Sequence, residues 1–230
     1  MRTTFAYPQH QVFLNYPFDQ AAEPFSAALH FGVISAGLLP VCAFDLTAPD
    51  RPRLEILVEA ITQCKYSVHD FSRYTGEGNE NLARFNMPIE MGMGLFHALQ
   101  TQRRDHRCAF FVTSPYLYRQ FASDLAGLDP ISYDCEDALL AGVYEWFRDS
   151  IRVVSIPKPT PEIIDNFEEY RRLLGGLRGS GKNGGASHHE RQELMYQVCS
   201  KSGLWQWRAN VLGMEAFPEL PLAWKKGAAD

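Results

Sequence analysis

The alternation of short apolar runs with helical patterns constrains the fold of this 230-residue chain most strongly. Four runs have the composition of buried strands, namely QVFLNY, LPVCAFD, KYSVHDF and CAFFVTS. Strands that alternate with helices form a parallel sheet with both faces covered. We therefore predict an α/β fold with four parallel strands, and IRVVSI at 151–156 is the candidate for a fifth. The spacing of apolar residues predicts helices over 116–128 and 136–150.

A change of pattern after PKPTP divides the chain into two predicted parts. Residues 1–156 form the α/β part, and residues 157–230 form an α-helical C-terminal extension. Within the extension, helices are expected in EIIDNFEEYRRLLGGL and ERQELMYQVCSKSGLW, on either side of a glycine-rich linker at 178–187. The first of these helices is predicted to present one apolar face, composed of Ile163, Phe167, Tyr170 and Leu174.

Composition argues against several classes of partner. The chain has 22 basic and 27 acidic residues, a net charge of −5, and no run of lysine or arginine longer than a pair. Nucleic acid is therefore not expected to be the main partner. No apolar run approaches the roughly 20 residues of a membrane span, and the N-terminal sequence lacks a signal-peptide pattern. The chain is expected to be cytoplasmic, without a membrane anchor.

The five cysteines are widely scattered, without a CxxC pair or a histidine at metal-ligand spacing. We interpret them as reduced, mostly buried thiols and predict no metal site. The C-terminal tail carries Trp205, Trp207 and Trp224. Because exposed aromatic patches often mark interfaces, this tail either caps the domain or pairs with a second copy of the chain in a homo-oligomer.

Glu90 is the leading candidate for a catalytic residue. It lies in NMPIEMGMGLFHAL, a predicted helix that begins at Asn86, where its carboxyl group would be in the first turn. The helix macrodipole favours an ionised carboxylate there by about 0.3 to 1 kcal/mol, so Glu90 is expected to be ionised at neutral pH. An ionised carboxylate can attack a glycosidic carbon or stabilise an oxocarbenium-like transition state. The alternative is that Glu90 only supports the helix start.

Two glycines inside the same predicted helix, Gly92 and Gly94, indicate a close approach to its backbone. Each costs on the order of 1 kcal/mol relative to alanine, so either a neighbouring strand or a ligand is expected to contact them. We include Gly92 and Asn86 among the predicted ligand-binding residues. The apolar face of this helix is predicted to consist of Ile89, Met93 and Phe96.

Asp70 ends a predicted strand and precedes a polar loop of about a dozen residues, a length often found in binding loops. Helices that follow parallel strands begin at the carboxyl edge of the sheet, where open α/β sheets bind ligands. Asp70 and Glu90 are therefore expected to face one crevice. Asp70 would accept hydrogen bonds from a ribose or a base, with Ser72 as a further ligand-binding candidate. The alternative is that Asp70 caps the loop in an Asx-turn.

The first predicted strand ends in NYPFDQ, which places Asn15, Pro17 and Phe18 at the same edge of the sheet. We predict that these residues bind the ligand. Asn15 can donate a hydrogen bond to a phosphate or a ribose, and Phe18 can stack on a base. For both, the alternative is a structural role in the turn or in the core, which is the commoner fate of such residues.

Taken in order, VFLNYPFD, KYSVHDFS and NMPIEMGMGLFHAL resemble motifs of the superfamily that joins nucleoside 2-deoxyribosyltransferases and bacterial TIR-like domains. In this resemblance Pro17 and Phe18 look like the first-strand turn, Asp70 like the strand-end acid, and Glu90 with Gly92 like the Glu-x-Gly pair. It implies a flavodoxin-like, three-layer sandwich. It also implies that the glutamate attacks or stabilises the anomeric carbon of a nucleoside or of NAD.

These observations lead to one leading hypothesis and two alternatives. The leading hypothesis is an N-glycosidase or ribosyl transferase that acts on NAD or a (deoxy)nucleoside or nucleotide, with Glu90 and Asp70 as catalytic residues and no separate cofactor. The first alternative is a non-catalytic nucleotide-sensing or assembly module of TIR-like type, which binds its ligand in the same crevice. The second is a flavin-binding, flavodoxin-like protein.

Overall fold

A sheet of five parallel strands in the order β2-β1-β3-β4-β5 lies at the centre of the structure, a computed structural model. The strands are β1 (Gln11–Asn15), β2 (Leu39–Cys42), β3 (Tyr66–Asp70), β4 (Arg107–Val112) and β5 (Ile131–Ser132). The structure describes residues 10–46, 50–73, 85–103, 105–120, 122–125, 127–152, 158–179 and 186–201.

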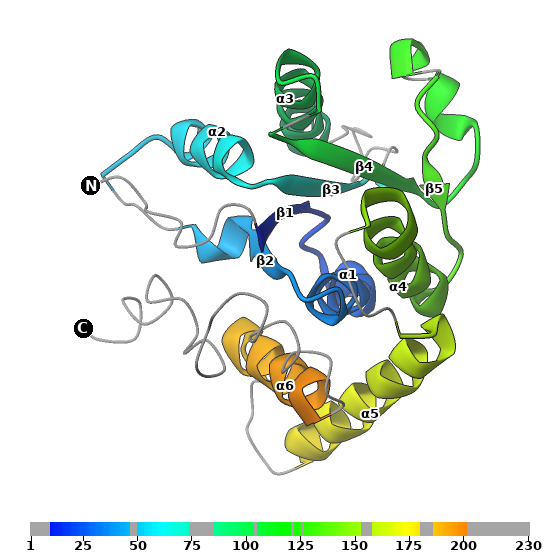
Figure 1. The fold of residues 1–230 in the computed structure, drawn as a ribbon. Coiled ribbons are helices and arrows are strands. Elements are labelled where there is room, and N and C mark those ends of the chain that lie inside the picture. Colours follow the sequence, from blue (N-terminus) through cyan, green and yellow to red (C-terminus); the bar gives the residue numbers. More distant parts are fainter. Residues whose placement is uncertain are drawn as a thin grey trace, which may run out of the picture.

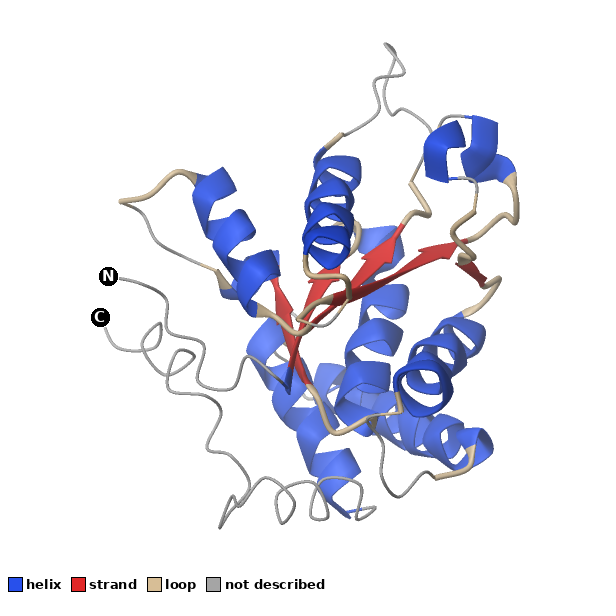
Figure 2. Cartoon of the chain, turned by 45° about the horizontal axis from the view of Figure 1, so that its top comes forward, coloured by secondary structure: helices blue, strands red, loops and turns tan. Residues whose placement is uncertain are grey.

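Helices cover both faces of this sheet (Figures 1 and 2). One face packs against α1 (Glu23–Ser35) and α4 (Glu136–Glu145), and the other against α2 (Arg53–Gln63) and α3 (Asn86–Gln100). Because side chains alternate along a strand, Val12 and Leu14 of β1 enter the first core while Phe13 enters the second. The predicted α/β fold is confirmed as a flavodoxin-like, three-layer sandwich.

The remaining helices extend the layer formed by α1 and α4. Helix α5 (Thr160–Gly179) and helix α6 (His188–Lys201) lie on the outer side of α1 (Figure 1). Phe31 of α1 contacts the ring of Phe167 at 5.2 Å and that of Tyr170 at 5.9 Å, measured between ring centroids. The predicted apolar face of α5 is confirmed, since Ile163, Phe167 and Tyr170 are buried in the same core as the sheet.

Parts of the predicted C-terminal extension lie outside the described residues. Helix α5 includes positions 178 and 179 of the predicted linker, and 180–185 and the tryptophan-rich tail after 201 are not among the described ranges. None of the helices in the described ranges has the length and apolar composition that a bilayer span requires. The short helical segments are η2 (Gln20–Ala22), η3 (Ala43–Asp45), η4 (Leu117–Gln120), η5 (Ser123–Leu125) and the π-helical η6 (Trp146–Ile151), which continues α4.

The fifth strand differs from the predicted one. It is β5, which pairs Ile131 with Phe111 and Ser132 with Val112 in the segment between the two helices predicted over 116–128 and 136–150. Position 151 of the predicted strand belongs to η6, and 153–157 lie outside the described residues. A two-residue strand is too short for an alternating or apolar pattern to appear, and its position depends on tertiary packing: Gly142 of α4 lies directly against Ile131.

The predicted helix over 116–128 is also wrong. This segment forms the two short 3-10 helices η4 and η5. Tyr116 has a φ of 69° and Gly127 a φ of 117°, conformations that a continuous right-handed helix does not contain. The buried side chain of Tyr118 donates its hydroxyl hydrogen bond to the Leu128 carbonyl at 3.2 Å and holds the segment in a compact loop.

Helix α3 contacts β3 through Gly94. A Cβ atom at this position would lie 2.8 Å from His69 Nε2 and 3.1 Å from Ser67 Oγ, so the neighbouring strand explains this glycine. The predicted apolar face of α3 is confirmed only at Met93, which packs against the core beneath α2, because Ile89 is 50% exposed and Phe96 60% exposed. The buried face consists of Met91, Gly94 and Ala98, since the helix approaches the sheet most closely where it lacks a side chain.

Alanine substitutions at the two glycines of α3 are expected to change stability in opposite directions. Gly92 is exposed and no atom lies within 4 Å of the place that a Cβ atom would occupy, so Gly92→Ala gains helix propensity, about 0.8 to 1 kcal/mol. Gly94→Ala has the same gain but displaces the buried His69, and overpacking of this kind costs typically about 1 to 3 kcal/mol. Urea unfolding measures both, and similar values for the two variants would contradict the close packing of α3 on β3.

Candidate functional site

A cavity of about 400 Å³ opens at the carboxyl edge of the sheet, at the end of β1. In this strand order the chain leaves β1 and β3 in opposite directions, and ligands of open α/β sheets bind at such a switch point. The walls come from the loop after β1, the starts of α2 and α3, and the segment after β3. Five predicted residues line the cavity: Asn15, Pro17, Phe18, Asn86 and Glu90.

Three further charged side chains line this cavity. Arg53 donates hydrogen bonds to the carbonyl oxygens of Leu46 at 2.9 Å and Ala43 at 2.7 Å, which hold its guanidinium at the start of α2. Because a carbonyl group has no net charge, Arg53 keeps its positive charge towards the cavity. Arg73 forms an ion pair with Asp19 at 2.8 Å and thereby joins the segment after β3 to the loop after β1. The arrangement suits an anionic group of a ligand near Arg53.

Glu90 faces this cavity from α3, but not from the first turn of the helix. It is the fifth residue of α3 and lies beyond the unpaired N–H groups of the helix start. Burial raises the pKa of Glu90 to about 7, and the positive charge of Arg53 opposes this rise. The predicted first-turn position of Glu90 is therefore wrong, and burial acts against the full ionisation that this position was expected to favour. Near neutral pH the protonated and ionised forms coexist.

Asn15 is buried, and a hydrogen-bond chain beneath α3 holds its amide group. Its Nδ2 atom lies 2.8 Å from the Met87 carbonyl oxygen and 3.2 Å from His69 Nδ1. The bond to Met87 fixes the first turn of α3, the helix that carries Glu90. Asn15 therefore connects the end of β1 to the position of the candidate catalytic carboxyl group.

The donor and the acceptor in each of these hydrogen bonds follow from the last residue of the series, His106. His106 Nδ1 must donate to the Cys64 carbonyl oxygen at 2.8 Å, so its Nε2 accepts from Ser67 at 2.8 Å. Ser67 then accepts from His69 Nε2 at 2.9 Å, and His69 Nδ1 accepts from Asn15. Burial lowers the pKa of His69 to about 3 and that of His106 to about 4, so both rings are neutral, as this pattern requires.

These hydrogen bonds correct the role predicted for Asn15. Both amide hydrogens are used, one by His69 and one by Met87. Asn15 is therefore not the expected donor to a phosphate or a ribose. A ligand can receive from it only the acceptor oxygen, which limits its partner to a hydroxyl or an N–H group.

Asp70 does not line the cavity with Glu90, contrary to the expected common crevice. Its carboxylate accepts hydrogen bonds from the Tyr133 hydroxyl at 2.8 Å and from both the backbone N–H and the hydroxyl of Ser72 at 3.0 Å. Burial raises the pKa of Asp70, and the hydrogen bonds from Tyr133 and Ser72 oppose this rise. The carboxylate caps the loop in an Asx-turn, which was the alternative interpretation. Ser72 is likewise used inside the protein.

The other predicted ligand-binding residues differ in their exposure and in whether they line the cavity. Pro17 is buried in the cavity wall, whereas Phe18 is 47% exposed and able to stack on a planar group. Asn86 is exposed at the start of α3. Gly92 is exposed and does not line the cavity. Most of the loop between Asp70 and Glu90, residues 74–84, lies outside the described residues.

Sequence reasoning missed Arg53 and His69. Arg53 follows the predicted strand LPVCAFD and the polar loop LTAPDRP, and it is the first residue of α2. Helix starts at the carboxyl edge of a sheet were the signal that identified Glu90. The same criterion applied to α2 would have included Arg53. His69 lies within an apolar run, and its contacts depend on the packing of α3, which the sequence does not show.

Comparison of the chain with models of known protein families and with curated proteins gives no match.

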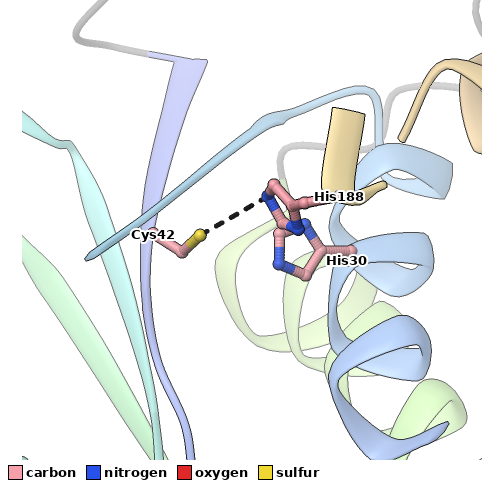
Figure 3. Close-up of side chains that lie close together, drawn as sticks. All are labelled: His30, Cys42 and His188. Atoms are coloured by element: carbon pink, nitrogen blue, oxygen red, sulfur yellow. Dashed lines mark hydrogen bonds between the residues drawn. The ribbon is translucent and has the colours of Figure 1, made fainter. Parts of the chain in front are cut away.

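A second cluster of polar side chains lies at the end of β2, between α1 and α6 (Figure 3). His30 of α1, Cys42 of β2 and His188 of α6 each offer one ligand atom, and these atoms lie within 4.8 Å of one another. Burial lowers the pKa of His30 to about 3 and raises the pKa of the Cys42 thiol. We predicted no metal site because these residues are far apart in the chain. Folding brings them together.

Proposed function

We propose that this protein is an N-glycosidase or ribosyl transferase that cleaves the N-glycosidic bond of NAD or a related nucleotide, with Glu90 as nucleophile or countercharge. The observation that carries this proposal is a partly buried carboxyl group beside a guanidinium in a cavity at the switch point of a parallel sheet. Such a perturbed carboxyl group in a concave site is typical of catalytic residues. The motif resemblance that includes Glu90 points in the same direction.

The cavity offers complementary groups to the parts of a nucleotide. Arg53 is suited to a phosphate oxygen, the Asn15 amide oxygen to a ribose hydroxyl, and the exposed ring of Phe18 to a base. Its volume of about 400 Å³ falls within the range of about 300 to 1,000 Å³ for small-molecule sites. These features support a nucleotide-sized ligand with its sugar near Glu90.

The leaving group distinguishes NAD from an ordinary nucleoside. Glycoside cleavage with a poor leaving group uses two carboxyl groups, one of which protonates the departing atom. Of the two carboxyl groups lining the described cavity, Asp19 is paired with Arg73 and Glu90 is left for the chemistry. Nicotinamide leaves NAD as a neutral base and needs no proton. One carboxylate is therefore sufficient for NAD, which we favour as the substrate class.

The proposed cleavage needs no cofactor, because its bonds, electron pairs and protons are all accounted for by NAD, Glu90 and water. The bond between C1′ of the ribose and the nicotinamide nitrogen breaks, and its electron pair stays on the nitrogen. Ionised Glu90 bonds to C1′ or stabilises its developing positive charge. Water then adds a hydroxyl group to C1′ and releases a proton to solvent, and any bond between Glu90 and C1′ breaks with its electron pair returning to the carboxylate. In the transferase reaction an acceptor base attacks C1′ in place of water.

Binding without chemistry is the second candidate function. Its support is Asp70, because the second predicted catalytic carboxyl group is used in hydrogen bonds within the protein. A nucleotide-sensing or assembly module would need the cavity and Arg53 but no turnover. Ligand at about 100 times its dissociation constant would then stabilise the fold by roughly 2.7 kcal/mol and would be recovered intact.

Incubation of the purified full chain with NAD and, separately, with 2′-deoxynucleosides tests these alternatives. We expect free nicotinamide from NAD, at a higher rate than free base from deoxynucleosides, because the latter require protonation of the leaving group. Chromatography of the products measures both rates, and thermal unfolding with and without ligand measures binding. Stabilisation without product would favour the sensing module. Neither product nor stabilisation would contradict both functions.

A further inference from the structure

The cluster of His30, Cys42 and His188 joins three elements that are distant in the sequence. Figure 3 shows the three side chains directed towards one another from α1, from the end of β2 and from the first residue of α6. Cys42 Sγ lies 3.6 Å from His188 Nε2. Imidazole nitrogen and cysteine sulfur are the ligands that zinc prefers in proteins. The chemical types and their convergence therefore match a zinc site.

The spacing of these atoms agrees with tetrahedral coordination. Zinc bonds of about 2.0 to 2.3 Å place neighbouring ligand atoms about 3.3 to 3.8 Å apart. The separation of Cys42 Sγ from His188 Nε2 falls in this range, and all three ligand atoms already lie within 4.8 Å. Asp45 adds a carboxylate, because its Oδ1 atom is 3.3 Å from His188 Nε2. The backbone N–H of Cys42 holds the other oxygen of Asp45 at 2.8 Å.

A buried glutamine provides an independent observation. Gln192 of α6 lies with its Nε2 atom 2.9 Å from His30 Nδ1, while its Oε1 atom is buried without a hydrogen-bond partner. A metal-ligating histidine usually donates its second ring N–H to an oxygen acceptor. Rotation of the Gln192 amide by half a turn supplies this acceptor to His30 Nδ1 and leaves Nε2 for the metal. The Tyr16 hydroxyl, now 3.0 Å from that Nε2 atom, would be displaced.

A catalytic cysteine, histidine and acid would be the competing interpretation of this cluster. In that arrangement the thiol contacts one ring nitrogen and the acid orients the other. Here Cys42 Sγ and Asp45 Oδ1 both approach Nε2 of His188, at 3.6 and 3.3 Å. One nitrogen cannot fill both roles. The convergence of several groups on a single point is instead the geometry of shared metal coordination.

We propose that His30, Cys42 and His188 bind a zinc ion, with Asp45 at the fourth position, and that this ion fastens α6 to the sheet and to α1. Binding replaces the hydrogen bonds within the cluster with metal bonds, and the thiol proton of Cys42 passes to solvent. The site is structural because all four positions are filled by protein. It stabilises the folded chain and does not take part in the reaction proposed for the cavity.

Zinc chloride added to the chelator-treated full chain tests this proposal. We expect one zinc ion per chain by elemental analysis and a higher midpoint of thermal unfolding than without metal. His188→Ala should weaken zinc affinity by more than the roughly 10- to 100-fold typical of outer-shell changes, and zinc should no longer raise its unfolding midpoint. His189→Ala, at the neighbouring exposed position of the same helix, is the matched control and should bind zinc like the wild type.

Cobalt(II) provides a second measurement that reports the thiolate directly. Bound at this site, it should give the charge-transfer absorption of a cobalt–sulfur bond in the wild type and in His189→Ala. Cys42→Ser should lack this absorption. If the buried serine prevents folding, the loss of zinc affinity in His188→Ala still tests the site. Absence of stoichiometric zinc in the wild type, or equal zinc affinity of His188→Ala and wild type, would overturn the proposal whether or not the cavity cleaves NAD.

Discussion

Replacement of Glu90 by glutamine is expected to lower the rate of nicotinamide release from NAD by about 1,000-fold, within the range of about 100- to 10,000-fold for a group that acts in the transition state. Glutamine keeps the size of the side chain, so the cavity retains its shape. Its neutral amide can neither bond to C1′ nor balance the positive charge that develops there. Initial rates at saturating NAD, measured from released nicotinamide, give the effect.

The pattern of kinetic constants makes this result specific. Loss of a group that acts only in the transition state lowers kcat with little change in KM, whereas a collapsed cavity would raise KM. Glu55→Gln is the matched control, because Glu55 is an exposed carboxyl group in the first turn of α2 and does not line the cavity. Its kcat should equal that of the wild type. Equal rates for Glu90→Gln and wild type would remove Glu90 from the mechanism.

The fold was predictable where a local pattern was long enough to be read. The four longer strands and the apolar face of α5 each repeat their pattern over several residues, and the structure confirms them. The two-residue strand β5 has no such pattern. Its position follows from the contact of Gly142 with Ile131, which joins two separate elements. The failure at 116–128 has a similar cause, since the buried Tyr118 directs the chain into 3-10 turns instead of a helix.

The sequence was sufficient to predict the edge of the sheet at which the cavity lies, but not which side chains point into it. Strand order and helix starts place residues at the carboxyl edge, and five of the predicted residues do line the cavity there. Which way a side chain points depends on alternation along each strand. His69 faces α3, so its neighbour Asp70 points to the opposite layer, where Tyr133 donates to it. The same argument applies to His30, Cys42 and His188, which no spacing rule connects.

The free energy of unfolding should reveal the partial burial of Glu90 without any substrate. Burial raises the pKa of Glu90 from about 4.5 to about 7, so between these pH values the folded chain binds more protons at this site than the unfolded chain. Stability then falls as pH rises. The contribution of Glu90 is fully present below pH 4.5 and is lost as pH passes 7, with an upper limit of about 3 kcal/mol.

Glu90→Gln should remove this dependence, because an amide does not titrate. We expect the variant to match the wild type near pH 4.5 and to be more stable by up to about 3 kcal/mol at pH 8, as measured by urea unfolding at both pH values. Asp70 and the buried histidines titrate in both proteins, so their contributions cancel in the difference. Parallel pH curves for the two proteins would show that Glu90 is solvated. If Glu90→Gln is more stable than the wild type but inactive, the ionised carboxylate lowers stability and is needed for activity. A residue that only supports the helix start would not show this combination.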